Sequence, residues 1–196
     1  MILTILILIT SSFLTITNSN FSESTYNNID FERLDSLAIV ECSQCVALPA
    51  GIGNSHLSYF AFSWNGFGSA EITFEEIGKI TSLEYLDLGP YCQIQQLPVS
   101  FRNLSNLKRL NLTMSSIQYL PTWLNELESL EELDISLTLI RQLSVDNFEN
   151  CNNLKYIYLF GTNVENLDDF VKELKAVRPD INVILDDIEM NYKINR

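Results

Sequence analysis

The residues of this sequence that could carry chemistry are carboxylates, tyrosines, four cysteines and a single histidine. Asp87, Glu132 and Asp134 recur at comparable places in neighbouring segments, and a pair of carboxylates with separated pKa values can catalyse hydrolysis. The sequence lacks a second histidine and a glycine-rich phosphate loop. We therefore expect an acidic surface patch at these carboxylates and no enzyme activity. Turnover that disappears in Asp134→Asn would be the sign of an enzyme.

The four cysteines do not form a recognisable metal site. Cys42 and Cys45 have the Cys-x-x-Cys spacing, but no second pair of ligands follows and His56 stands alone, so the sequence predicts no metal and no cofactor. Spacing does not determine disulfide connectivity. The pairing of Cys42, Cys45, Cys92 and Cys151 therefore stays open, and a Cys42–Cys45 disulfide fits a secreted protein.

Charge and sequons bear on the partner and the location. The formal net charge of −13, with 25 acids against 12 bases, argues against nucleic acid, because phosphate binding needs clustered Lys and Arg. Triplets of the form Asn-x-Ser/Thr begin at Asn20, Asn103 and Asn111. In a secreted eukaryotic protein each is a candidate N-glycosylation site.

Residues 1–19 are predicted to be a signal peptide. An apolar run from Ile2 to Ile9 continues weakly through Phe13 and Leu14, and polar residues interrupt it before it reaches the roughly 20 residues of a membrane span. The run lacks a preceding Lys or Arg, so a buried N-terminal strand and an uncleaved anchor remain alternatives. We expect a secreted or cell-surface protein without a stable membrane span; the alternative is a cytoplasmic one. Residues 20–33 form a polar lead-in.

A repeat of 23 to 24 residues organises the rest of the chain. The segments "LEYLDL", "LKRLNL", "LEELDI" and "LKYIYL" start at Leu83, Leu107, Leu130 and Leu154, in steps of 24, 23 and 24 residues. Related segments start upstream at Leu34 and Leu57, and a closing strand follows around Val183. A single unit of this size cannot bury its own apolar side, so successive units must stack.

The second half of each unit recurs as well, in "LPVSFRNL" (97–104), "LPTWLNEL" (120–127), "LSVDNFENC" (143–151) and "LDDFVKEL" (167–174). Pro98 and Pro121 suit the first position of a short helical turn. Cys151 stands where the other segments have Leu, which predicts a core residue. The spacing from Leu167 to Val177 predicts a final helix with one apolar face.

The repeated L-x-x-L-x-L segments, over about four fifths of the chain, resemble the leucine-rich-repeat family. The resemblance implies an α/β fold over residues 34–187, with about six repeats and a closing helix and strand, followed by a tail at 188–196. The family's solenoid is right-handed, with a parallel β-sheet on its concave face and short helical turns on its convex face. The family has an asparagine at a fixed position after each strand. At this position the present sequence has Cys42, Asn65, Cys92, Ser115, Thr138 and Thr162.

Alternate strand residues of such a solenoid face the open concave side. We call these residues the concave face and predict that it binds another protein, because Tyr, Trp and Arg often anchor interfaces. Packing of the tyrosines on one another and on Arg109 is the structural alternative. An intracellular signalling adaptor, or a spacer within a larger receptor assembly, is the alternative function. The predicted contacts are Tyr59, Trp64, Tyr85, Asp87, Arg109, Asn111, Glu132, Asp134, Tyr156, Tyr158 and Phe160.

Overall fold

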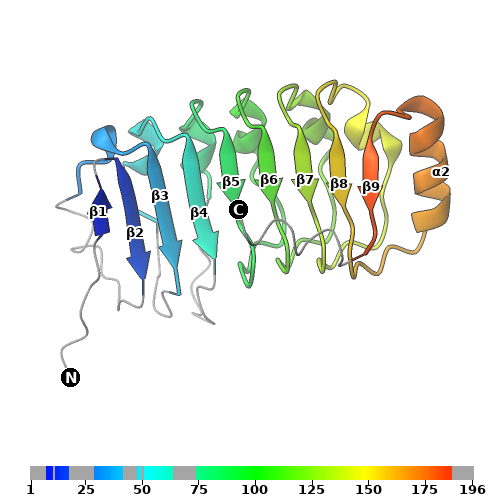
Figure 1. Ribbon diagram of the computed structural model, residues 1–196, viewed down its shortest axis with the longest axis horizontal. Helices are drawn as coiled ribbons and strands as arrows, with labels where there is room; N and C mark the ends of the chain where they lie inside the picture. The colour runs from blue at the N-terminus through cyan, green and yellow to red at the C-terminus, as the bar shows by residue number, and fades with distance from the viewer. Residues whose placement is uncertain are drawn as a thin grey trace.

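The strands of the protein lie side by side in chain order and form one open sheet (Figure 1). The computed structural model describes residues 8–10, 12–17, 29–41, 48–49, 51–63 and 74–186. Strands β1 and β2 are antiparallel, and every later neighbouring pair is parallel. The strands are β1 (Leu8–Thr10), β2 (Phe13–Thr17), β3 (Ser36–Val40), β4 (Tyr59–Ser63), β5 (Tyr85–Asp87), β6 (Arg109–Asn111), β7 (Glu132–Asp134), β8 (Tyr156–Tyr158) and β9 (Asn182–Ile184).

The core consists of columns of apolar residues that run along the solenoid. The strands pair without offset, so that each inward leucine lies beside its equivalent in the next coil. One column contains Leu86, Leu110, Leu133 and Ile157, and the next contains Leu88, Leu112, Ile135 and Leu159; all are buried. Each coil therefore buries the apolar side of its neighbours, which confirms the repeat predicted from the sequence.

The convex side is built from short 3₁₀ helices. Pro98 and Pro121 each precede such a helix, one position earlier than predicted, and their carbonyls accept from the N–H groups of Phe101 and Leu124 at 3.1 Å. A fixed φ and a missing N–H are compatible with this boundary position. The 3₁₀ helices are η1 (Phe31–Arg33), η2 (Ile52–Asn54), η3 (Ile77–Lys79), η4 (Val99–Asn103), η5 (Thr122–Glu126) and η6 (Val145–Phe148).

Threonine hydroxyl groups stand at the position of the family's asparagine after β7 and β8. The Oγ1 atoms of Thr138 and Thr162 donate to the carbonyls of Ile135 and Leu159 at 2.7 and 2.9 Å. These bonds satisfy carbonyls at a bend, where an unpaired buried group would cost about 1–3 kcal/mol. Ser115 occupies the same position, but its buried Oγ has no partner in the described structure.

The C-terminal end is closed by the helix α2 (Leu167–Val177) and by β9, which lies at the edge of the described sheet (Figure 1). Phe170 and Leu174 are buried, as predicted from their spacing, whereas Val177 is exposed. The last helix has no following coil in the described chain to cover its outer side. The same reason applies to Leu185, which follows β9 and is exposed.

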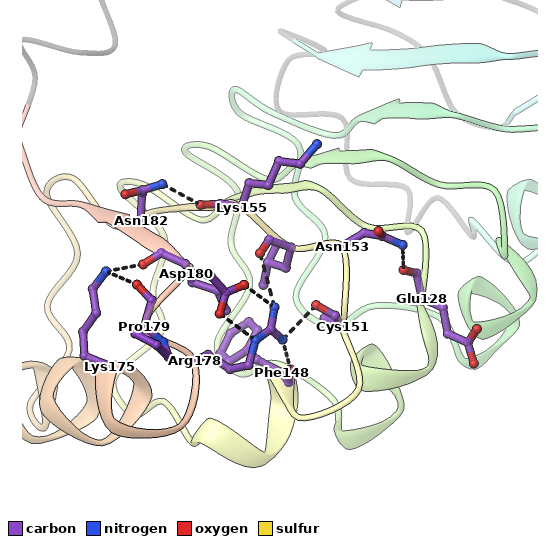
Figure 2. Close-up of polar contacts among 12 residues, drawn as sticks. Glu128, Phe148, Cys151, Asn153, Lys155, Lys175, Arg178, Pro179, Asp180 and Asn182 are labelled. Atoms are coloured by element: carbon purple, nitrogen blue, oxygen red, sulfur yellow. Dashed lines mark hydrogen bonds and ion pairs between the residues drawn. The ribbon is translucent and has the colours of Figure 1, made fainter.

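Arg178 joins this end to the preceding coil (Figure 2). Its Nη1 atom donates to the carbonyls of Cys151 and Phe148 at 3.0 and 3.4 Å, and Nη2 lies 3.5 Å from the carbonyl oxygen of Leu154. The guanidinium also forms an ion pair of 2.9 Å with Asp180. The carbonyls of Phe148 and Cys151 also accept from the backbone N–H groups of Cys151 and Leu154, so that Arg178 adds a second, charged donor to each.

The N-terminal end contains a strand that precedes the first repeat. Leu14 and Ile16 of β2 pair in register with Leu37 and Ile39 of β3, and all four are buried. Residues 13–17 therefore extend the apolar columns in this structure. Removal of residues 1–19 as a signal peptide remains a prediction. Among the described residues, none of the helices has the length and apolar character that a bilayer crossing requires.

Candidate binding face

The sheet brings most of the predicted contact residues together in two rows across the strands. The register places each residue directly beside its equivalent on the next strand. Because neighbouring strands are about 4.8 Å apart, side chains within a row can touch. The first row is Tyr59, Tyr85, Arg109, Glu132 and Tyr156, and the second contains Asp87, Asn111, Asp134 and Tyr158.

Arg109 occupies the middle of the first row and is held from both sides. Its Nη2 atom donates to Glu132 at 2.7 Å, and its guanidinium carbon lies 5.7 Å from the centre of the Tyr85 ring. This distance is within the range of a cation–π contact. The structural alternative named from the sequence, in which a tyrosine packs on Arg109, is therefore observed for Tyr85.

The tyrosines of this face differ in exposure. Tyr85 and Tyr156 are 38% and 37% exposed, whereas Tyr158 is 6% exposed. The rings of Tyr156 and Tyr158 stack with centroids 6.2 Å apart. The expectation that Tyr158 is open to solvent is thus wrong: it is buried, and the ring of Tyr156 stacks on it. Phe160 is half-buried.

The second row is fixed by hydrogen bonds to its own backbone. The Oδ1 atom of Asp87 accepts from the Gly89 N–H at 3.0 Å, and Asp134 makes the same bond to Ser136 at 3.0 Å. Asn111 repeats the motif with the Thr113 N–H at 2.9 Å. These turns hold two carboxylates and an amide in fixed positions, since each side chain is anchored two residues further along.

Gly89 is required where two coils approach closely. A Cβ atom at this position would lie 2.4 Å from the carbonyl oxygen of Thr113 in the next coil. Any side chain here would push apart the strands that carry Asp87 and Asn111. The glycine therefore contributes to the spacing of the second row.

The environment of the second row shifts the pKa of the Asp87 carboxyl group. Burial raises its pKa above 3.8, and the negative charge of Asp134 adds to this; hydrogen bonds from the Gly89 N–H and the Asn111 side chain act in the opposite direction. Desolvation disfavours the charged form and here outweighs the hydrogen bonds. The face therefore holds a carboxylate whose charge is incompletely compensated.

The pKa of Asp87 predicts a pH dependence of stability. Folding raises the pKa of this carboxyl above 3.8, its value in the unfolded chain. The group therefore contributes stability when the pH is below the unfolded-state pKa, and this contribution is lost as the pH rises through the folded-state pKa. We expect Asp87→Asn to melt at the same temperature as the wild type or higher at neutral pH. Thermal melts of both proteins across the acidic range test this. A clear loss of stability in Asp87→Asn at neutral pH would contradict it.

Sequence reasoning missed the charged residues at the start of these strands. An open depression of about 260 Å³ is lined by Tyr85, Lys108, Arg109, Glu131 and Glu132. Lys108 contacts Glu84 of the previous coil, and Lys155 contacts Glu131, each at 2.7 Å. The signal was present in the repeat: the residue after each opening leucine is Glu84, Lys108, Glu131 and Lys155, with alternating charge.

Cys92 and Cys151 are buried free thiols. Burial raises the pKa of Cys92 to about 12 and that of Cys151 to about 11. Cys151 lies in the core, as its place in the repeat predicted, with Sγ 3.5 Å from the Leu124 carbonyl oxygen. Both thiols are therefore protonated near neutral pH, and a protonated thiol is a poor nucleophile.

We expect Cys92 and Cys151 to resist alkylation in the folded protein. Iodoacetamide at about pH 8 should label neither residue until denaturant is added, because both burial and the raised pKa suppress the thiolate. Peptide mapping by mass spectrometry identifies the labelled positions. Rapid labelling of either residue in the native state would contradict the buried positions.

The remaining candidate residues lie away from this face or outside the described residues. Asn103 is exposed at the end of η4, on the convex side. His56 is exposed in a loop, as expected from its position before Leu57. Within the described ranges, His, Cys, Asp and Glu form no group of three or more that could hold a metal ion. The predictions for Asn20, Cys42, Cys45 and Trp64 fall on residues that the structure does not describe.

Comparison with protein families gives no match, and comparison with curated proteins gives none. Solved structures do match. An internalin from Listeria monocytogenes superposes with a TM-score of 0.57 and 18% identity, over 88% of this chain and 53% of the internalin. A leucine-rich-repeat protein from Leptospira interrogans gives a TM-score of 0.51 and 16% identity, over 85% of this chain and 52% of that protein.

A complex of TLR13 with ssRNA13 gives a TM-score of 0.54 and 23% identity, over 65% of this chain and 18% of TLR13. The chain thus spans about half the length of the internalin and of the Leptospira protein. At these identities the likeness concerns the fold. The parallel sheet, the stacked apolar columns and these structures together identify the chain as a leucine-rich-repeat solenoid.

Proposed function

We propose that this chain is a non-catalytic recognition module that binds another protein through its concave face. The observation that carries the proposal is the exposure of Tyr85 and Tyr156 on either side of Arg109 and Glu132. Tyrosine combines a large apolar area with a polar group, and tyrosine and arginine are enriched at interface hot spots. Two exposed tyrosines on a rigid sheet supply such anchors with little loss of side-chain entropy on binding.

The charge of the chain favours a protein over a nucleic acid as the partner. One of the similar structures is a complex with ssRNA. The present chain has a formal net charge of −13, which repels a phosphate backbone. The acidic residues of the face, Asp87, Glu132 and Asp134, have the same sign as a phosphate and would oppose its approach.

A binding screen with matched variants tests the proposal. We expect partners captured by the wild type to be lost from Tyr85→Ala/Tyr156→Ala, because both anchors are removed while buried Tyr158 stays in place. Tyr119→Ala is the control, since this tyrosine is exposed on another part of the coil and bonds Gln96. Equal capture by the double variant and the wild type would contradict binding through this face.

A structural spacer within a larger receptor assembly is the second candidate. It is favoured by the ion pairs within and beside the face, Arg109–Glu132, Lys108–Glu84 and Lys155–Glu131. This candidate predicts that the isolated chain captures no partner in the same screen.

We also propose that the protein is secreted or displayed at the cell surface, on the basis of its apolar N-terminal segment. The intracellular adaptor is the alternative. If the protein is secreted, Asn103 is the better glycan acceptor, because its exposed position leaves room for sugar. The Asn111 side chain, by contrast, is hydrogen-bonded to the Thr113 N–H and to Asp87. The intact mass of the natively made protein tests both points. A chain that begins at Met1 without sugar would contradict secretion.

A further inference from the structure

The positive charges on the concave face and at its border are paired with glutamates of the protein itself. Lys108, Arg109 and Lys155 each form an ion pair of 2.7 Å with a glutamate of a neighbouring coil. Asp87 and Asp134 have no ion-pair partner among the described residues. The unbalanced charge of the face is therefore negative and is concentrated on these two carboxylates.

The two carboxylates flank a single amide. Asp87 lies on β5, Asn111 on β6 and Asp134 on β7, all in register. Two strand spacings place the backbones of the two aspartates about 10 Å apart. The hydrogen bonds to Gly89 and Ser136 fix both side chains at the ends of their strands. A cationic group above Asn111 would lie between two fixed negative charges.

The surroundings suit an organic cation better than a metal ion. Ca²⁺ needs six to eight oxygen ligands at about 2.3–2.6 Å, which two side chains on alternate strands do not supply. Tyr85 and Tyr156 expose their rings in the adjacent row. Tyr85 already accepts the guanidinium of Arg109 on its face at 5.7 Å, which shows that these rings can pack against arginine. The face thus offers negative charge beside aromatic area.

We propose that the partner presents an arginine or lysine side chain that binds above Asn111, between Asp87 and Asp134, while its neighbouring residues pack on Tyr85 and Tyr156. This inference rests on the proposed function of the concave face. The net charge of −13 adds long-range attraction for a basic partner. Binding of the cation also relieves the unfavourable ionisation of Asp87, since an opposite charge stabilises the carboxylate.

The test uses a pair of variants that preserve the fold. Asp87→Asn/Asp134→Asn keeps an oxygen that can accept from Gly89 and Ser136, and Asn111 shows that asparagine fits this row. The control, Glu149→Gln/Glu173→Gln, removes the same number of charges at exposed positions, one directly after η6 and one on α2. Thermal melts establish that both double variants are folded. The probe is a labelled hexa-arginine peptide, compared with hexa-citrulline, in which the charge is absent.

We expect the wild type to bind the arginine peptide and not the citrulline peptide at about 0.15 M salt, where weak long-range attraction is screened. The aspartate variant should bind at least about tenfold more weakly, since it removes both charge partners. The control should keep its affinity within about twofold, since only long-range attraction changes. Equal weakening of both variants would show non-specific attraction and overturn the inference, as would unchanged binding by the aspartate variant.

The same variants separate this inference from the proposed function. A captured partner that is lost from Tyr85→Ala/Tyr156→Ala but retained by Asp87→Asn/Asp134→Asn supports the binding face and overturns the basic anchor. A partner lost from both supports both. A partner retained by both variants overturns the binding face itself, whatever the peptide result. A partner retained by the tyrosine variant but lost from the aspartate variant supports the basic anchor and contradicts the tyrosine anchors.

Discussion

Leu110→Ala is expected to lower the free energy of unfolding by about 2–5 kcal/mol, the range for buried leucines. Leu110 is 1% exposed and lies in register between Leu86 and Leu133. Truncation leaves a cavity in the middle of a continuous column, and both neighbouring coils lose contacts. Because each coil is stabilised mainly by its neighbours, a central defect weakens the whole array.

Urea unfolding of Leu110→Ala and the wild type measures this effect. Leu139→Ala is the matched control: the same substitution is made at a leucine that is 55% exposed, where we expect a change within about 0.5 kcal/mol. A loss in Leu110→Ala no larger than in the control would mean that the apolar column does not hold the coils together.

Arg178→Met is expected to destabilise the C-terminal end by about 1.5–3 kcal/mol, the range for hydrogen bonds to a charged group. The guanidinium of Arg178 bonds the carbonyls of Phe148, Cys151 and Leu154, and its side chain is 16% exposed (Figure 2). Methionine keeps much of the apolar stem but removes every donor. The carbonyls at the end of η6 would then be left without this partner.

Hydrogen exchange locates the effect of Arg178→Met. Protection should fall first in α2 and β9, which are attached to the array on one side within the described chain, and less at β6. Arg141→Met serves as the control, because this arginine is 69% exposed and its ion pair with Glu165 is 3.5 Å long; such exposed pairs contribute about 0–1 kcal/mol. A uniform change along the solenoid would contradict the role of Arg178 as a local cap.

Arg178→Lys refines the same prediction. A lysine ammonium has three donors on one atom, whereas the guanidinium spreads its donors over a plane. The lysine variant should therefore recover part of the lost protection in α2, because it can reach one or two of the carbonyls. Full recovery would show that the positive charge matters more than the geometry of the donors.

The sequence alone determined the repeat and the residues that form the core. Leu86, Leu110 and Leu133 recur at fixed spacing, and a strand alternates its side chains with period two. These properties are local, so the inward columns could be assigned without coordinates. The same reasoning placed Cys151 in the core, where the structure finds it buried.

The tertiary structure decided which outward residues are accessible and which charges are compensated. Tyr156 and Tyr158 are both outward in the repeat, but only Tyr156 is substantially exposed. Exposure depends on the side chains packed around each ring, which include the adjacent ring of the same strand and residues of other coils about 24 positions away in the sequence. The ion pairs of Lys108 and Arg109, and the lack of a described one at Asp87, likewise result from contacts between coils.

The ends of the solenoid show the same division. The sequence predicted the final helix from the spacing of Phe170 and Leu174, and both are buried. It did not predict that Arg178 would bond three carbonyls of an earlier coil, because that contact depends on where the helix ends relative to η6. Periodicity within a coil is encoded locally, whereas the pairing of polar groups between coils depends on side-chain geometry that emerges only when the coils stack.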